Sequence, residues 1–128
     1  MAQYVSRITL LVTDQDEALK YYTEILGFRL VEDRQVTPTK RWVVVAPAGS
    51  GETGFLLSLA SDEQQQARVG NQTGGKVLLV LRTDDFENDL NRLKEHEVRI
   101  VRGPVTEPWG DVVVFEDLYG NKWDLVGR

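Results

Sequence analysis

The sequence contains no cysteine and only one histidine, His96, among its 128 residues. The absence of cysteine excludes disulfide bonds, thiolate metal sites and cysteine nucleophiles, and it is compatible with a cytoplasmic location. A single histidine late in a predicted helix cannot supply a Ser-His-Asp arrangement. Its position favours a solvent-exposed residue near a helix C-terminus, with a catalytic histidine as the alternative.

Long apolar runs and excess positive charge are absent as well. No run approaches the ~18–20 apolar residues of a membrane span, and the N-terminal segment MAQYVSRITLLV predicts a strand rather than a cleavable signal. The formal net charge is −5 and lysine and arginine form no stripe, which argues against a nucleic-acid partner. With 41% hydrophobic and 27% charged residues, the composition is that of a soluble globular protein.

What the chain does contain is an internal repeat. Residues 12–31 and 82–101 follow one plan: a strand ends, an acidic cap follows, an amphipathic helix runs, and a second strand begins. Each copy has the D-x-x-E spacing of a capping box, starting at Asp14 and at Asp84. The repeat predicts two modules of similar fold, with a site between them.

The predicted elements give two βαβββ modules, and therefore an α+β protein. Module one, residues 4–60, has a strand at 4–13, a helix at 14–26 and strands at 28–36, 41–47 and 54–60. Module two, residues 76–127, has a strand at 76–83, a helix at 85–96 and strands at 98–106, 111–117 and 121–127. The polar segment 61–75 is the linker. Because ~60 residues bury little apolar surface alone, the modules should pack as one domain, residues 1–128, or against a second chain.

Two motifs carry a resemblance to a known family. VTDQDEALKYYTEILGF (residues 12–28) and WGDVVVFEDLYGNKWDLV (residues 109–126) together resemble the vicinal oxygen chelate superfamily. This superfamily includes glyoxalase I, bleomycin-resistance proteins, fosfomycin-resistance enzymes, methylmalonyl-CoA epimerase and extradiol dioxygenases. The resemblance implies a U-shaped mixed sheet around a cleft, and often a homodimer whose clefts take one module from each chain.

The resemblance also implies where a metal would be held. In metal-dependent members, two ligands come from the first strands of the modules and two from the last strands. These positions fall on Arg7, on Leu78 (or Val77 if the repeat is aligned through its caps), on Leu57 with Ser58 beside it, and on Asp124. Only Asp124 can ligate, whereas a divalent ion needs about three protein ligands. We therefore expect no metal and no cofactor.

A second group of candidate ligand-binding residues lies in module one and the linker. Lys40, Arg41 and Trp42 place two cations and an indole at the start of a strand, where they could bind an anionic or aromatic molecule. Gln72 lies in a loop, residues 71–73, that could close over such a ligand. The alternatives are a solvated hairpin and a plain connector.

Aromatic and acidic residues also gather in module two. The aromatic residues are Trp109, Phe115, Tyr119 and Trp123, which could form a wall of the cleft but in alternating strands are more often core. The acidic residues are Glu107, Asp111, Glu116 and Asp117, which at a hairpin are usually only solvated.

Three functions remain open. The leading one is a homodimeric, cytoplasmic protein of the glyoxalase/bleomycin-resistance type that binds a small molecule in a metal-free cleft. The second is a divalent-metal-dependent lyase, isomerase or dioxygenase of the same superfamily. The third is a metal-free enzyme with Asp124 as general base. Under the leading hypothesis, Arg7 and Asp124 line the cleft and form a salt bridge at the position that the metal ion occupies in metal-dependent members.

Overall fold

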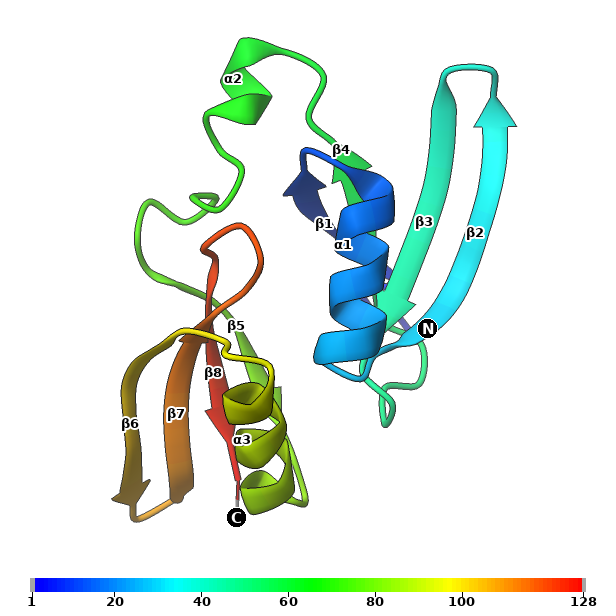
Figure 1. Cartoon of the computed structure of the whole chain (residues 1–128). Helices are drawn as coiled ribbons and strands as arrows, with labels where there is room; N and C mark the ends of the chain where they lie inside the picture. The colour runs from blue at the N-terminus through cyan, green and yellow to red at the C-terminus, as the bar shows by residue number, and fades with distance from the viewer. Residues whose placement is uncertain (1, 128) are drawn as a thin grey trace. The chain divides into compact units, whose positions relative to one another are not determined.

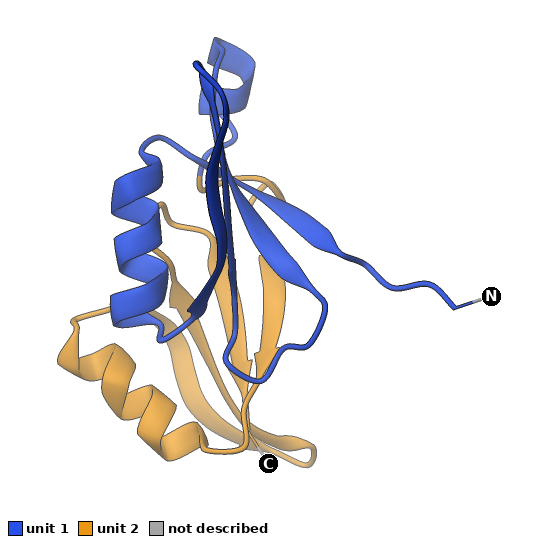
Figure 2. Ribbon diagram, turned by 90° about the vertical axis from the view of Figure 1, so that its right-hand side faces the viewer, with its two compact units in different colours: residues 1–69 blue, residues 70–128 orange. Residues whose placement is uncertain are grey.

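The computed structural model describes residues 2–127, which form two compact units divided between Val69 and Gly70 (Figure 2). The division falls inside the predicted linker. Unit 1 contains β1 (Arg7–Val12), α1 (Gln15–Lys20), the π-helical turn η1 (Tyr21–Ile25), β2 (Arg29–Thr37), β3 (Lys40–Ala46), β4 (Gly54–Leu59) and α2 (Glu63–Gln66). Unit 2 contains β5 (Val77–Arg82), α3 (Phe86–Glu95), β6 (Ile100–Glu107), β7 (Gly110–Glu116) and β8 (Lys122–Val126).

Each unit has a mixed four-stranded sheet, in the order β1-β4-β3-β2 or β5-β8-β7-β6. The first strand of each unit pairs in parallel with the last, and the other pairs are antiparallel. One helix, α1 or α3, covers one face of its own sheet (Figure 1). We call the opposite face the helix-free face. The predicted α+β class and the two βαβββ modules are confirmed.

The helix caps explain how the repeat is aligned. Asp14 caps α1 as predicted, since its side chain accepts a hydrogen bond of 2.9 Å from the Glu17 amide. The cap of α3 is Asp85, which accepts from the Asn88 amide, so the prediction of Asp84 is wrong by one residue. The helices of the two units are therefore 71 residues apart in sequence.

Apolar side chains on the helix-covered face form the core of each unit. In unit 1, the rings of Tyr22, Phe28 and Phe55 follow one another at centroid distances of 5.7 and 6.2 Å. In unit 2, Phe115 stacks on Trp123 at 6.1 Å, and both rings are buried. These two aromatic residues are therefore core, as the alternative interpretation of the module-two aromatics predicted.

The turn between β7 and β8 is fixed by one buried carboxylate. The side chain of Asp117 accepts hydrogen bonds from the amides of Tyr119 and Asn121, from the Asn121 side chain and from the Trp123 indole, all at 3.0–3.1 Å. Because these donors are buried or partly buried, the carboxylate satisfies groups that water reaches poorly. Asp117 is thus structural, unlike a solvated hairpin carboxylate.

The predicted linker, residues 61–75, contains regular structure that the sequence pattern did not indicate. Asp62 caps the short helix α2 by accepting a hydrogen bond of 2.8 Å from the Gln65 amide. Gly70 then adopts a left-handed conformation, and a Cβ there would come 1.8 Å from the Tyr119 carbonyl oxygen. Only glycine fits so close to the β7–β8 turn.

Within residues 2–127, no helix is long and apolar enough to cross a membrane.

Candidate functional site

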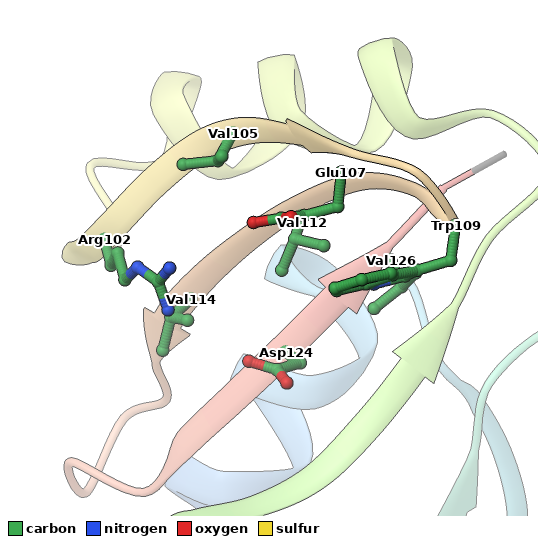
Figure 3. Close-up of a pocket in the computed structure, with 8 residues that line it drawn as sticks. All are labelled: Arg102, Val105, Glu107, Trp109, Val112, Val114, Asp124 and Val126. Carbon is green, nitrogen blue, oxygen red and sulfur yellow. The ribbon is translucent and has the colours of Figure 1, made fainter.

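The helix-free face of unit 2 contains a hollow of about 320 Å³ (Figure 3). Strands β6, β7 and β8 and the β6–β7 turn supply its walls. Four valine side chains give the hollow an apolar lining. Three charged side chains and one indole border it, and such groups can orient a bound molecule. The lining residues are Arg102, Val105, Glu107, Trp109, Val112, Val114, Asp124 and Val126.

Strand register explains why these side chains share one face. Asp124 pairs with Val80 on one side and with Val114 on the other, and Val114 pairs with Arg102. Paired residues on neighbouring strands project to the same side of a sheet. Residues 123 and 125, one step along β8, are buried on the opposite face, toward α3.

A bulge in β6 brings Arg102 and Val105 together. They are three residues apart, so a regular strand would place them on opposite faces. The register shifts between them, where Gly103 has φ +90°. A Cβ on Gly103 would come 2.7 Å from the Val112 carbonyl oxygen, so the bulge requires glycine.

The three charged groups of the hollow have no partners of their own. Among residues 2–127, the side chains of Arg102, Glu107 and Asp124 make no hydrogen bond and no ion pair. Figure 3 shows that all three project from their strands toward the hollow. Glu107 and Asp124 are half-buried and Arg102 is exposed. These groups are consequently available to a ligand.

Trp109 is the aromatic residue of the hollow. It lies in the turn between β6 and β7, and 62% of its surface is exposed. Its exposed indole adjoins the valines of the hollow, so it can add flat apolar contact area for a bound molecule. The predicted aromatic group is therefore divided: Trp109 lies at the hollow, while Phe115 and Trp123 lie in the core.

Arg7 lies on the helix-free face of unit 1. Its guanidinium donates hydrogen bonds of 2.8 Å and 3.3 Å to the carbonyl oxygens of Ser6 and Glu52. A Cβ on Gly54, the strand partner of Arg7, would come 2.8 Å from Cγ1 of Val44 and make an ordinary contact of 3.6 Å with Nη1 of Arg7. Arg7 and Asp124 belong to different units, and their predicted salt bridge stays a prediction.

The predicted last-strand position of module one lies on the wrong face. Leu57 is fully buried on the helix-covered face, where its carbonyl oxygen accepts a hydrogen bond from Gln15. The pair Thr9–Leu56 in unit 1 corresponds to the pair Val80–Asp124 in unit 2. Leu56 is therefore the counterpart of Asp124. A shift of one residue reverses the face to which a strand side chain points.

The predicted first-strand position of module two, Leu78, lies at an irregularity in β5. The register shifts between Val77, which pairs with Lys122, and Leu79, which pairs with Trp123. Leu78 has no partner in this register and is half-buried. Neither aliphatic candidate at this position offers a ligand atom.

The cluster at the start of β3 does not form one surface. Arg41 points to the helix-covered face, where it donates two hydrogen bonds of 2.9 Å to Asp33 and one of 2.6 Å to Asp16. Trp42, the next residue, points to the helix-free face with Lys40, whose ammonium lies 5.9 Å from the indole centroid. Consecutive strand residues cannot line the same face.

The remaining candidates are less prominent. Gln72 belongs to the turn that follows Gly70 and is half-buried, and its predicted role as part of a lid stays a prediction. His96 is the exposed C-cap residue of α3, away from the residues that line the hollow.

The donor set does not fit a divalent metal ion. In the part of the chain that the structure describes, no group of three histidine, cysteine or acidic residues is placed to hold one. The hollow offers two carboxylates, Glu107 and Asp124, beside the cation of Arg102. A guanidinium at this place would repel a metal ion, and two carboxylates are fewer than the usual three protein ligands.

Comparison with known proteins identifies the family. Residues 4–125 match the Glyoxalase/Bleomycin resistance protein/Dioxygenase superfamily. The chain belongs to this superfamily, which confirms the resemblance found in the two motifs. A protein of Shewanella frigidimarina (strain NCIMB 400), described as uncharacterized, is 48% identical over 127 residues, covering 98% of this chain and 94% of its own.

Solved structures agree with this assignment. UcmS2 is 31% identical with a TM-score of 0.85, covering 98% of both chains. TnmS3, described as an antibiotic binding protein from Streptomyces sp. CB03234, is 32% identical with a TM-score of 0.79, covering 99% of this chain and 97% of its own. A superfamily member from Sphaerobacter thermophilus DSM 20745 is 34% identical with a TM-score of 0.81, covering 99% and 98%.

Proposed function

We propose that the protein binds a small organic molecule reversibly, without a metal ion, and sequesters or carries it. The observation that carries this proposal is the hollow of unit 2, in which an apolar floor adjoins three charged side chains without partners. A volume of about 320 Å³ lies at the lower end of the usual range for small-molecule sites. The likeness to TnmS3, an antibiotic binding protein, supports a binding role.

The donor set favours binding over metal-dependent catalysis. Arg102, Glu107 and Asp124 can make charge-assisted hydrogen bonds to a ligand, which orient it strongly. The absence of a suitable ligand set at the positions of Arg7, Leu56 and Leu78 leaves Asp124 as the one acid of that group. We therefore include the metal-free state in the proposal.

Native mass spectrometry tests the proposal directly. The protein, incubated with a mixture of small aromatic and polar metabolites, should retain at least one with 1:1 stoichiometry per chain. The variant Val112→Trp should lose it, because an indole in place of the isopropyl group fills the floor of the hollow. The matched control Val36→Trp changes an exposed valine of unit 1 that does not line the hollow. Equal retention by all three proteins would contradict the proposal, as would one tightly bound equivalent of a transition metal.

The proposal extends to a two-fold homodimer in the cytoplasm. Each unit is small and has one sheet face on which no helix of its own packs (Figure 1), and symmetric pairing is the commonest way to cover apolar surface in small proteins. The lack of cysteine suits a reducing compartment. Light scattering should give twice the chain mass of 14.5 kDa at micromolar concentration, and a monomer there would contradict the dimer.

A further inference from the structure

Charges of both signs line the hollow of unit 2 without compensating one another. Arg102 lies on β6 at one end of the lined surface, and Glu107 lies at the other end of the same strand, beside the turn that holds Trp109. Asp124 projects from β8, across the floor. No ion pair joins these three side chains in the described structure.

Their separation follows from the sheet. Arg102 and Asp124 stand in one row with Val114 between them, so their Cα atoms are about 10 Å apart, two strand spacings. Glu107 pairs with Gly110, which has no side chain to cover its carboxylate. Glu107 therefore lies about four residues farther along the sheet than the row of Arg102 and Asp124. All three side chains border the valine floor (Figure 3).

A ligand with charge of one sign would leave part of this hollow uncompensated. Covering an ionised side chain removes its water, and this is costly unless an opposite charge replaces the water. A cation would satisfy Glu107 and Asp124 but would cover Arg102 without a partner. An anion would satisfy Arg102 and would be repelled by the two carboxylates.

We propose that the hollow takes a flat amphoteric molecule, with a protonated amine attracted by Glu107 and Asp124 and an oxyanion at Arg102. This inference rests on the proposed function and names the class of its ligand. The planar guanidinium of Arg102 suits a carboxylate or similar oxyanion, which it can bind with two parallel hydrogen bonds. The aromatic body lies over the valine floor beside the exposed indole of Trp109, which can stack on it and attract the amine.

Four biphenyl probes test the inference by isothermal titration calorimetry. They are 4′-(aminomethyl)biphenyl-4-carboxylate, which carries both charges, 4-(aminomethyl)biphenyl, biphenyl-4-carboxylate and the neutral 4-biphenylmethanol. The amphoteric probe should bind at least about tenfold more tightly than either singly charged probe, because each charge adds a charge-assisted hydrogen bond. Equal affinity of the amphoteric probe and one singly charged probe would overturn the inference and leave the proposed function standing. Failure of all four probes to bind would overturn the use of this hollow, and the proposed function with it.

Isosteric variants assign each charge to its partner. Arg102→Met should weaken the amphoteric probe about tenfold and leave the aminomethyl probe unchanged. Glu107→Gln and Asp124→Asn should each weaken both amine-bearing probes several-fold and leave biphenyl-4-carboxylate unchanged or tighter. Asp111→Asn is the matched control, since Asp111 lies next to the hollow but bonds Thr106 on the other face. A loss of affinity in the control as large as in the variants, or no loss in the variants, would overturn the assignment; circular dichroism establishes that each variant is folded.

Discussion

The row Thr9–Leu56–Val44–Glu32 in unit 1 and the row Val80–Asp124–Val114–Arg102 in unit 2 occupy matching places in two sheets of the same topology. In unit 1 the last-strand position is a leucine, and the outer position is Glu32, which forms an ion pair with Arg34. In unit 2 the same two positions are Asp124 and Arg102, neither of which has a partner in the described structure. At these matching positions the same fold thus carries a glutamate that is ion-paired in unit 1 and two charged side chains without partners in unit 2.

The side chains two residues away along β3 and β7, on the same faces, differ in volume. Trp42 of unit 1 corresponds to Val112 of unit 2, and their partners on the neighbouring strand are Arg34 and Val105. Large side chains fill the face of unit 1, with Lys40 lying over Trp42. Small ones leave the face of unit 2 hollow. The hollow of unit 2 thus differs from the filled face of unit 1 by a few side chains, without a change of topology.

The largest expected difference between the units concerns the connections into their last strands. Asp117→Ala should lower the free energy of unfolding by about 3–5 kcal/mol, because it leaves four donors without their acceptor. In unit 1 the corresponding loop is held by Arg29, which donates to the carbonyl oxygens of Ser50 and Gly51 at the surface. Arg29→Ala should cost less than about 1 kcal/mol. Urea denaturation measures both, and equal costs would show that the two connections are held alike.

A reciprocal exchange at the matching positions sharpens the comparison. Leu56→Asp should destabilise unit 1 by about 2–3 kcal/mol, since it places an unpaired carboxylate beside Val44. Asp124→Leu should change stability by less than about 1 kcal/mol, because Val80 and Val114 flank the position with apolar surface. Thermal unfolding of both variants gives the answer. If Leu56→Asp were harmless, the helix-free face of unit 1 would be as tolerant of charge as that of unit 2.

Opening the face of unit 1 should not create a second site. Trp42→Val removes the indole that Lys40 lies against, at a cost of about 1 kcal/mol from lost packing and the lost cation–π contact. Binding of the amphoteric biphenyl probe should change less than twofold, because unit 1 lacks a counterpart of Asp124. A second equivalent of bound probe in calorimetry would show that volume alone makes the site.

The smallest expected effect is the pH dependence of the ion pair on the helix-covered face of unit 1. Hydrogen bonds from Arg41 lower the pKa of Asp33, against a smaller opposing effect of burial. The folded-state pKa is thus below the unfolded value, so the stabilisation is present above about pH 4 and is lost as the pH falls through the folded value. The stability difference between wild type and Asp33→Asn should be under about 1 kcal/mol at pH 6 and should shrink as the pH falls below about 4. A difference that grew on acidification would contradict this sign.

The architecture could be predicted from the sequence, because the hydrophobic periodicity, the glycines and the capping residues all indicate the same strands and helices. The two ends of each predicted strand and helix lie within three residues of the observed ends, when α1 and η1 are taken together as one helix. The exceptions are local. Asp84 and Asp85 are adjacent acids that can both cap a helix, and the choice between them shifted the alignment of the repeat by one residue. That shift decides whether Val77 or Leu78 is the counterpart of Arg7. The position of Leu57 came from the family pattern, and the strand pairing places Leu56 there instead.

The site was harder to predict, because its residues share a face only through irregular pairing. Alternation along β8 separates Asp124 and Val126 from Trp123 and Leu125, and this signal was available in the sequence. Arg102 and Val105 were not predictable in this way, since the bulge at Gly103 breaks the period of two. Arg41 was a candidate because of its charge, and its charge turned out to be paired with Asp33 and Asp16.

The exposure of Trp109 gives the protein an optical signal of its own. Of the three tryptophans, Trp123 is 1% exposed and Trp42 is half-buried, while Trp109 is 62% exposed. A water-soluble quencher such as iodide should therefore reach the fluorescence of Trp109 first, and a molecule seated on the valine floor should shield it. Occupancy of the hollow can then be followed in unlabelled protein, and even in a cell extract, by the fraction of emission that becomes inaccessible to the quencher.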